Sequence, residues 1–199
     1  MDSLCYLAKE YKLDGFRFDL MGLLDIQTLN TAAEKLRRIN PSIILYGEGW
    51  TGGKSPLPER LRAMKKNAVK LPQYAMFSDD FRDGVKGSVF EDEECGYVNG
   101  NASELSEMMK SVISGGIYRM DVQRKRSECW TDTPQQAVNY VEAHDNLTLF
   151  DKLRISMPEA SGQERVSVDK LAAALVFLSE GIPSVSYTHL RAHETGAYL

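Results

Sequence analysis

Cysteine is scarce in this sequence, and its scarcity excludes two kinds of architecture. Only Cys5, Cys95 and Cys129 occur among the 199 residues. They are odd in number, far apart, and none belongs to a CxxC pair, so they indicate neither a disulfide framework nor a cysteine metal site. We expect three ordinary reduced cysteines and no bound metal.

The sequence also lacks a long apolar run, an excess of basic residues and a glycine-rich dinucleotide motif. No apolar run reaches the roughly 18 residues that a membrane-spanning helix needs, so we expect no membrane partner. The formal net charge is −4, which argues against nucleic acid, because proteins that bind it usually carry a basic face. No GxGxxG segment follows a predicted strand, which excludes the dinucleotide-binding α/β proteins.

The sequence does contain a regular alternation of two kinds of segment. Hydrophobic spacing predicts helices over 4–11, 28–39, 102–114 and 163–179, and strands over 13–19, 43–46, 74–78 and 137–143. Glycine and proline predict a long loop over 49–59, and residues 79–101 are predicted to be irregular. Strands that alternate with helices indicate βαβ units and a parallel sheet, so the predicted class is α/β.

Carboxylates stand at the ends of three predicted strands. Asp19 ends the first strand, Glu48 follows the second, and Asp145 follows the fourth. A parallel barrel places its chemistry at the carboxyl ends of its strands. Asp19 and Glu48 are roughly 30 residues apart, about one βαβ unit, which would give them equivalent places on neighbouring strands. Arg17 lies two residues before Asp19 and shares its face of the strand, where it would orient that carboxylate.

Two carboxyl groups with different roles are what glycoside hydrolysis requires. One attacks the sugar or activates water, and the other donates a proton to the leaving oxygen. Trp50, two residues after Glu48, offers a flat apolar face of the kind that stacks on a sugar. Each of these residues taken singly is equally well explained as a turn, cap or core residue. Their joint placement at strand ends favours a sugar-cleaving enzyme.

Several segments resemble one family. DGFRFD at 14–19, YGEGW at 46–50 and VEAHDN at 141–146 stand in this order. They resemble the second, third and fourth conserved regions of the α-amylase superfamily, which comprises α-glucan-active barrel enzymes. FSDDFRD at 77–83 and HDNLTL at 144–149 are similar to its type I pullulanase subfamily, whose members cleave α-1,6 branch linkages.

The resemblance implies a retaining mechanism with named roles. Asp19 would be the nucleophile, Glu48 the general acid/base, and Asp145 the residue that stabilises the oxocarbenium-like transition state. Arg17 would orient Asp19. The other substrate contacts that the resemblance implies are His144, Trp50 and Asn146. The implied partner is an α-glucan, bound by a monomeric complete enzyme without a cofactor; calcium occurs in some relatives, but no dedicated ligand cluster stands out.

The resemblance runs over residues 1–183 and implies a partial (β/α)8 barrel, covering roughly strands four to seven with their helices. The family's first conserved region and C-terminal β-domain have no counterpart here, so we expect a fragment of a longer enzyme. A half barrel exposes sheet edges, so we expect the isolated chain to be inactive. Residues 184–199 do not resemble the family and are interpreted as a non-native tail. The first residues lack the pattern of a signal peptide; the compartment stays open, with the cytoplasm preferred to secretion.

Two alternatives remain open within this interpretation. The first is another superfamily enzyme, either isoamylase-like or acting on α-1,4 links. The second is a sugar-binding relative without catalysis. Such relatives usually lose one carboxylate, whereas all three are present here.

Overall fold

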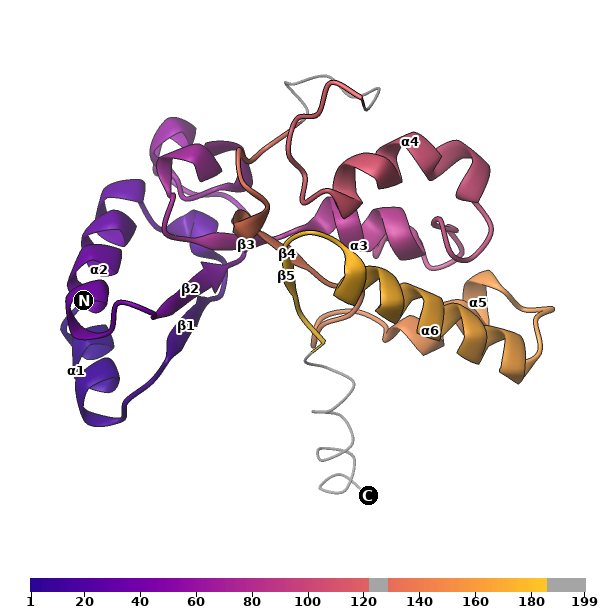
Figure 1. Cartoon of the computed structure of the whole chain (residues 1–199), viewed down its shortest axis with the longest axis horizontal. Coiled ribbons are helices and arrows are strands. Elements are labelled where there is room, and N and C mark those ends of the chain that lie inside the picture. The colour runs from indigo at the N-terminus through magenta and orange to yellow at the C-terminus, as the bar shows by residue number, and fades with distance from the viewer. Residues whose placement is uncertain (122–128, 186–199) are drawn as a thin grey trace. The chain divides into compact units, whose positions relative to one another are not determined.

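The computed structural model describes residues 1–121 and 129–185, which form two compact units. The first unit contains Met1–Phe77 and Trp130–Asp132, and the second contains the other described residues. In each unit helices alternate with parallel strands (Figure 1). The α/β prediction is therefore confirmed.

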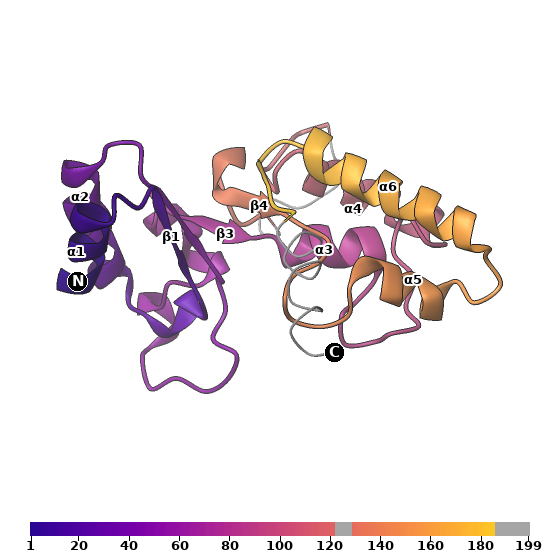
Figure 2. The ribbon, with the colours of Figure 1, turned by 90° about the horizontal axis from the view of Figure 1, so that it is seen from below.

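Three parallel strands form the sheet of the first unit. β1 (Gly15–Phe18) pairs with β2 (Ile44–Gly47), and β2 pairs with β3 (Ala75–Phe77). The helices α1 (Asp2–Glu10) and α2 (Ile26–Ile39) lie side by side on one side of β1 and β2 (Figures 1 and 2). Because the strands are parallel, their carboxyl ends share one edge of the sheet.

The α2 helix shows why these residues adopt this arrangement. Asp25 caps it by accepting a hydrogen bond from the Thr28 backbone N–H at 2.8 Å. Hydrogen bonds from the Thr28 side chain and backbone hold the pKa of Asp25 below its usual value. The helix buries an apolar stripe at helical spacing, formed by Leu29, Ala32, Ala33 and Leu36. Short 3-10 helices complete the unit: η1 (Met21–Leu23), η2 (Glu59–Leu61) and η3 (Lys65–Lys70).

The second unit is mainly helical. Its strands β4 (Ala137–Asn139) and β5 (Ile182–Pro183) pair in parallel, and the 3-10 helix η5 (Pro134–Gln136) leads into β4. Its helices are α3 (Asp79–Lys86), α4 (Ala102–Ile113), α5 (Leu149–Ser156) and α6 (Gly162–Leu178). α3 packs beside α4, and α5 packs beside α6 (Figure 2). Their shared core contains Phe81, Val85, Met109, Val112, Val141, Leu149, Leu153, Ala172 and Val176.

The prediction of irregular structure over 79–101 is wrong for its first eight residues, which form α3. The Ser78 hydroxyl caps this helix by accepting from the Phe81 N–H at 3.3 Å. Phe81 and Val85, four residues apart, are fully buried. Aspartates and a glycine within the segment lower its intrinsic helix propensity. The apolar spacing of Phe81 and Val85 alone is therefore too weak a signal to predict a helix here.

Two other differences lie on either side of Asp145. The fourth strand is shorter than predicted and ends at Asn139 rather than at residue 143, because Val141 packs into the helical core instead of extending the sheet. The helix α5 is not among the predicted elements. Its signal is a capping pattern, in which the Thr148 hydroxyl accepts from the Asp151 N–H at 3.3 Å.

The remaining expectations about organisation stay predictions. The tail is described only for residues 184 and 185, and residues 186–199 lie outside the described part. The boundary at residue 183 is therefore untested. Cys5, Cys95 and Cys129 are present as thiols rather than as disulfides. Among the described residues, no helix has the length and apolar character needed to cross a membrane.

Candidate active site

Asp19 and Glu48 follow two paired strands at the same edge of the first unit's sheet. The register places Phe18, the last residue of β1, opposite Gly47, the last residue of β2. The Glu48 backbone N–H continues the ladder by donating to the Phe18 carbonyl at 3.0 Å. The first residue beyond each strand is therefore a carboxylate, in the equivalent positions that the sequence predicts.

The Arg17 guanidinium links these two carboxylates. Its Nη2 lies 3.1 Å from Asp19 Oδ1 and 3.0 Å from Glu48 Oε1. The guanidinium carbon also lies 5.3 Å from the centre of the Phe77 ring, within range of a cation–π contact. Because one nitrogen pairs with both carboxylates, Asp19 Oδ1 and Glu48 Oε1 can be no further apart than the sum of these two distances. This is compatible with the roughly 5–5.5 Å between the carboxyl groups of retaining glycosidases.

The two carboxylates differ sharply in exposure. The Asp19 side chain is 67% exposed, whereas the Glu48 side chain is only 6% exposed. Glu48 Oε2 also accepts a hydrogen bond from the Leu20 backbone N–H at 2.7 Å. Glu48 is therefore held in a fixed, enclosed position, while Asp19 faces solvent, where a substrate could reach it.

The turn after Asp19 is built around this contact. Leu20 has φ 42° and ψ 47°, a left-handed conformation that is uncommon for a residue other than glycine. Two residues further on, Gly22 donates its N–H to the carbonyls of Glu48 at 3.2 Å and Trp50 at 3.1 Å. A Cβ on Gly22 would lie 2.5 Å from the Trp50 carbonyl oxygen, so only glycine allows this approach.

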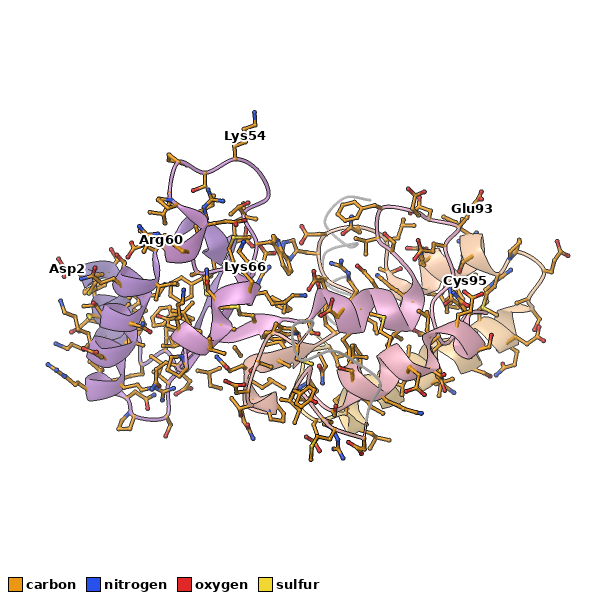
Figure 3. All side chains as sticks on the ribbon, turned by 90° about the horizontal axis from the view of Figure 1, so that it is seen from above. Asp2, Lys54, Arg60, Lys66, Glu93 and Cys95 are labelled. Carbon is orange, nitrogen blue, oxygen red and sulfur yellow. The ribbon has the colours of Figure 1, made fainter. Side chains whose placement is uncertain are left out.

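Trp50 is half-buried and begins the long loop that the sequence predicts after Glu48. Figure 3 shows Lys54 on this loop, with its side chain pointing away from the ribbon. The loop returns at η2, where Lys66 forms an ion pair with Glu59. The use of the Trp50 ring as a sugar platform stays a prediction.

His144, Asp145 and Asn146 lie together in the second unit, in the loop between β4 and α5. All three are exposed, and His144 Nε2 lies 3.4 Å from Asp145 Oδ1. Asn146 has φ 64°, which makes a left-handed turn directly after the carboxylate. That these residues act together with Asp19 and Glu48 stays a prediction.

Sequence reasoning missed two parts of the site, namely the second partner of Arg17 and the Leu20 amide. Alternation along one strand relates Arg17 to Asp19 but carries no information about Glu48, which depends on strand register. Within residues 1–121 and 129–185, no three His, Cys, Asp or Glu side chains gather as they would around a metal ion. The expectation that no metal or cofactor is needed stays a prediction.

Comparisons with known proteins identify one group of relatives. The pullulanase of Bacillus subtilis (strain 168) is 36% identical over 184 residues, which cover 92% of this chain and 25% of that protein. The crystal structure of pullulanase type I from Bacillus subtilis str. 168 complexed with maltose matches with a TM-score of 0.85 and 37% identity, covering 92% of this chain and 25% of that one. The pullulanase of Anoxybacillus sp. LM18-11 complexed with maltotriose matches with a TM-score of 0.83 and 43% identity, covering 92% and 24%. No protein-family model matches.

These likenesses extend over nearly the whole chain but only part of each relative. The chain spans about a quarter of the length of the relatives it matches. In sequence and fold the chain is similar to pullulanases. It is consistent with a fragment of a type I pullulanase.

Proposed function

We propose that the chain forms part of the catalytic (β/α)8 barrel, roughly strands four to seven, of a retaining glycosidase that cleaves α-1,6 branch linkages in α-glucans. Pullulan, amylopectin and glycogen limit dextrins contain such linkages. The observation that carries the proposal is the Arg17 guanidinium, which holds Asp19 and Glu48 together at the carboxyl edge of adjacent parallel strands. The relatives support the substrate class, since those named pullulanase include structures with bound maltose and maltotriose.

The exposure of the two carboxylates matches two successive displacements. In the first, the exposed Asp19 attacks the anomeric carbon while Glu48 donates a proton to the leaving oxygen, and the glycosidic bond breaks. In the second, Glu48 takes a proton from water, the water oxygen attacks the same carbon, and the bond to Asp19 breaks. Arg17 keeps the two groups in register and balances the negative charge that Glu48 acquires when it gives up its proton.

The other predicted residues take supporting roles in this proposal. Asp145 stabilises the positive charge that develops on the sugar, and His144, Asn146 and Trp50 contact the glucan. The complete enzyme acts as a monomer on its α-glucan, without a cofactor, nucleic acid or membrane. The isolated chain, which matches about a quarter of its relatives, is proposed to be inactive.

The proposal is tested by moving the chain into a complete enzyme. In this "exchange enzyme", residues 1–183 replace the matching segment of the Bacillus subtilis pullulanase. We expect it to release reducing ends from pullulan, because the chain supplies its own nucleophile and acid/base, while the isolated 199-residue chain releases none. A well-folded exchange enzyme without activity would contradict the proposed function, and pullulan cleavage by the isolated chain would contradict the proposed inactivity.

The same enzyme separates the alternatives within the superfamily. A debranching enzyme cleaves pullulan and leaves linear maltodextrin intact, whereas an enzyme acting on α-1,4 links does the reverse. A non-catalytic relative retains maltotriose binding and cleaves neither substrate. Binding measured by calorimetry beside both activity assays distinguishes all three outcomes.

Gly47 offers a test of how Glu48 is positioned. A Cβ at this residue would lie 2.4 Å from the Phe18 carbonyl oxygen and 3.1 Å from the Met21 sulfur. We expect Gly47→Ala to destabilise the first unit by ~1–3 kcal/mol, because the two strands must move apart. The thermal midpoint of the exchange enzyme measures this loss. Gly53→Ala is the matched control, since a Cβ there meets nothing within 4 Å; equal midpoints for the two variants would contradict the proposed packing.

A further inference from the structure

The loop over residues 143–148 carries His144 and Asp145, yet both of these side chains are exposed to solvent. A charged residue that must meet a transition state needs a fixed place, because small displacements of catalytic groups cost activity steeply. The contacts at the two ends of this loop are therefore the candidates for holding Asp145 in place.

Glu142 closes the loop across its base. Its Oε2 accepts a hydrogen bond from the Leu149 backbone N–H at 2.8 Å. Leu149 is the first residue of α5 and is 1% exposed. The N–H of a first helical residue has no acceptor within its own helix, so Glu142 satisfies a buried donor that the helix cannot. A carboxylate at this end is also favoured by the helix dipole.

The same helix fixes the other side of the loop. The Thr148 hydroxyl donates to Asp151 Oδ2 at 2.6 Å, and it accepts from the Asp151 N–H at 3.3 Å. Between the two attachments, the backbone of Asn146 turns through a left-handed conformation. Residues 143–148 thus form a short arch. It is attached to α5 at one end through Glu142 and at the other end through Thr148.

The charge of Glu142 acts on ionisable groups of two further helices. Lys86, at the end of α3, is 2% exposed. Burial and the nearby Arg82 lower the pKa of Lys86 to about 8, against the opposing effect of the Glu142 charge. On α6, burial and the Glu142 charge raise the pKa of Asp169. The carboxylate of Glu142 therefore lies within electrostatic reach of α3 and α6 as well as at the start of α5.

We infer that Glu142 is a positioning residue, which holds the arch that carries His144 and Asp145 by capping α5 from the opposite side of the loop. The inference rests on the proposed function for its effect on catalysis. Glu142 acts through the backbone of Leu149 and touches no substrate. A glutamine can accept the same hydrogen bond, whereas an alanine leaves the buried N–H of Leu149 without this acceptor.

The test compares three variants of the exchange enzyme. We expect Glu142→Ala to lower kcat on pullulan by about 10- to 100-fold with a smaller change in KM, because Asp145 serves the transition state more than the bound substrate. Glu142→Gln should restore kcat to within a few-fold, because the acceptor returns. Glu159→Ala removes an exposed carboxylate of the same unit and should leave kcat and KM unchanged.

Amide hydrogen exchange gives a second readout that does not depend on activity. We expect exchange at Leu149 and along residues 143–148 to accelerate in Glu142→Ala and to stay slow in Glu142→Gln. Given an active exchange enzyme, two results would overturn the inference. One is a Glu142→Ala variant that keeps its kcat, and the other is a folded Glu142→Gln variant whose kcat falls as far as that of Glu142→Ala. If the exchange enzyme cleaves no pullulan, the proposed function fails. The amide hydrogen-exchange rates of the variants then decide by themselves whether Glu142 holds the arch.

Discussion

The Asp19→Asn and Glu48→Gln variants of the exchange enzyme are each expected to lose nearly all hydrolysis of pullulan. Removal of a general acid/base costs roughly 10²- to 10⁴-fold in rate, and removal of a nucleophile costs at least as much, because an amide does not form the glycosyl ester. Both replacements keep the size of the side chain. Initial rates at saturating pullulan measure the loss, and near-UV circular dichroism shows that the fold is intact.

The two variants should differ in a way that identifies each role. A substrate with a good leaving group, such as an α-maltosyl fluoride, needs no proton from the enzyme to break its bond. Glu48→Gln should therefore release a rapid burst of about one fluoride per enzyme, after which turnover slows because hydrolysis of the glycosyl-enzyme still needs the base. Asp19→Asn should release no burst, because its defect lies in the attacking group. The reverse pattern would exchange the two assignments.

The chain offers a control for each replacement. Asp14→Asn makes the same change just before β1, at the other end of the strand from Asp19. Glu34→Gln makes the second change on an exposed position of α2. Both should keep the parental rate. Full turnover in Asp19→Asn or in Glu48→Gln would remove that residue from the catalytic pair.

Much of the first unit could be predicted because its signals are local. Alternation of side chains along β1 relates Arg17 to Asp19, and the length of one βαβ unit relates Asp19 to Glu48. The structure confirms both relations, through the 3.1 Å ion pair and the strand register. The contact between Arg17 and Glu48 could not be predicted in the same way, because it depends on which residues of two strands stand opposite each other.

The second unit was harder to predict for a different reason. The apolar spacing of Phe81 and Val85 is interrupted by aspartates and a glycine, so burial stabilises α3 against a weak local propensity. Val141 reads as a continuation of β4 but packs among helices. In both cases the tertiary core decides the outcome, and one segment read alone does not contain that information.

Arg17→Met is expected to impair both stability and turnover, because it leaves Glu48 without its guanidinium partner. The Glu48 side chain is only 6% exposed, and leaving one member of a buried ion pair alone typically costs ~3–5 kcal/mol. The 29% exposure of the Arg17 side chain allows water to replace part of the lost contact, so we expect a loss toward or below the lower end of that range. A fall in the thermal midpoint of the exchange enzyme measures the loss. Arg38→Met, on the exposed side of α2, should leave the midpoint unchanged.

The origin of that loss can be isolated with a double variant. If the unpaired Glu48 charge causes the instability, adding Glu48→Gln to Arg17→Met should raise the midpoint, although both single replacements remove a native group. Arg17→Lys keeps the charge, but a compact ammonium cannot match both carboxylates as a guanidinium does, so an intermediate midpoint is expected. Additive losses in the double variant would mean that Arg17 stabilises the unit mainly through Asp19 and the Phe77 ring. A midpoint that recovers would instead show that the Arg17 guanidinium offsets the burial of the Glu48 carboxylate.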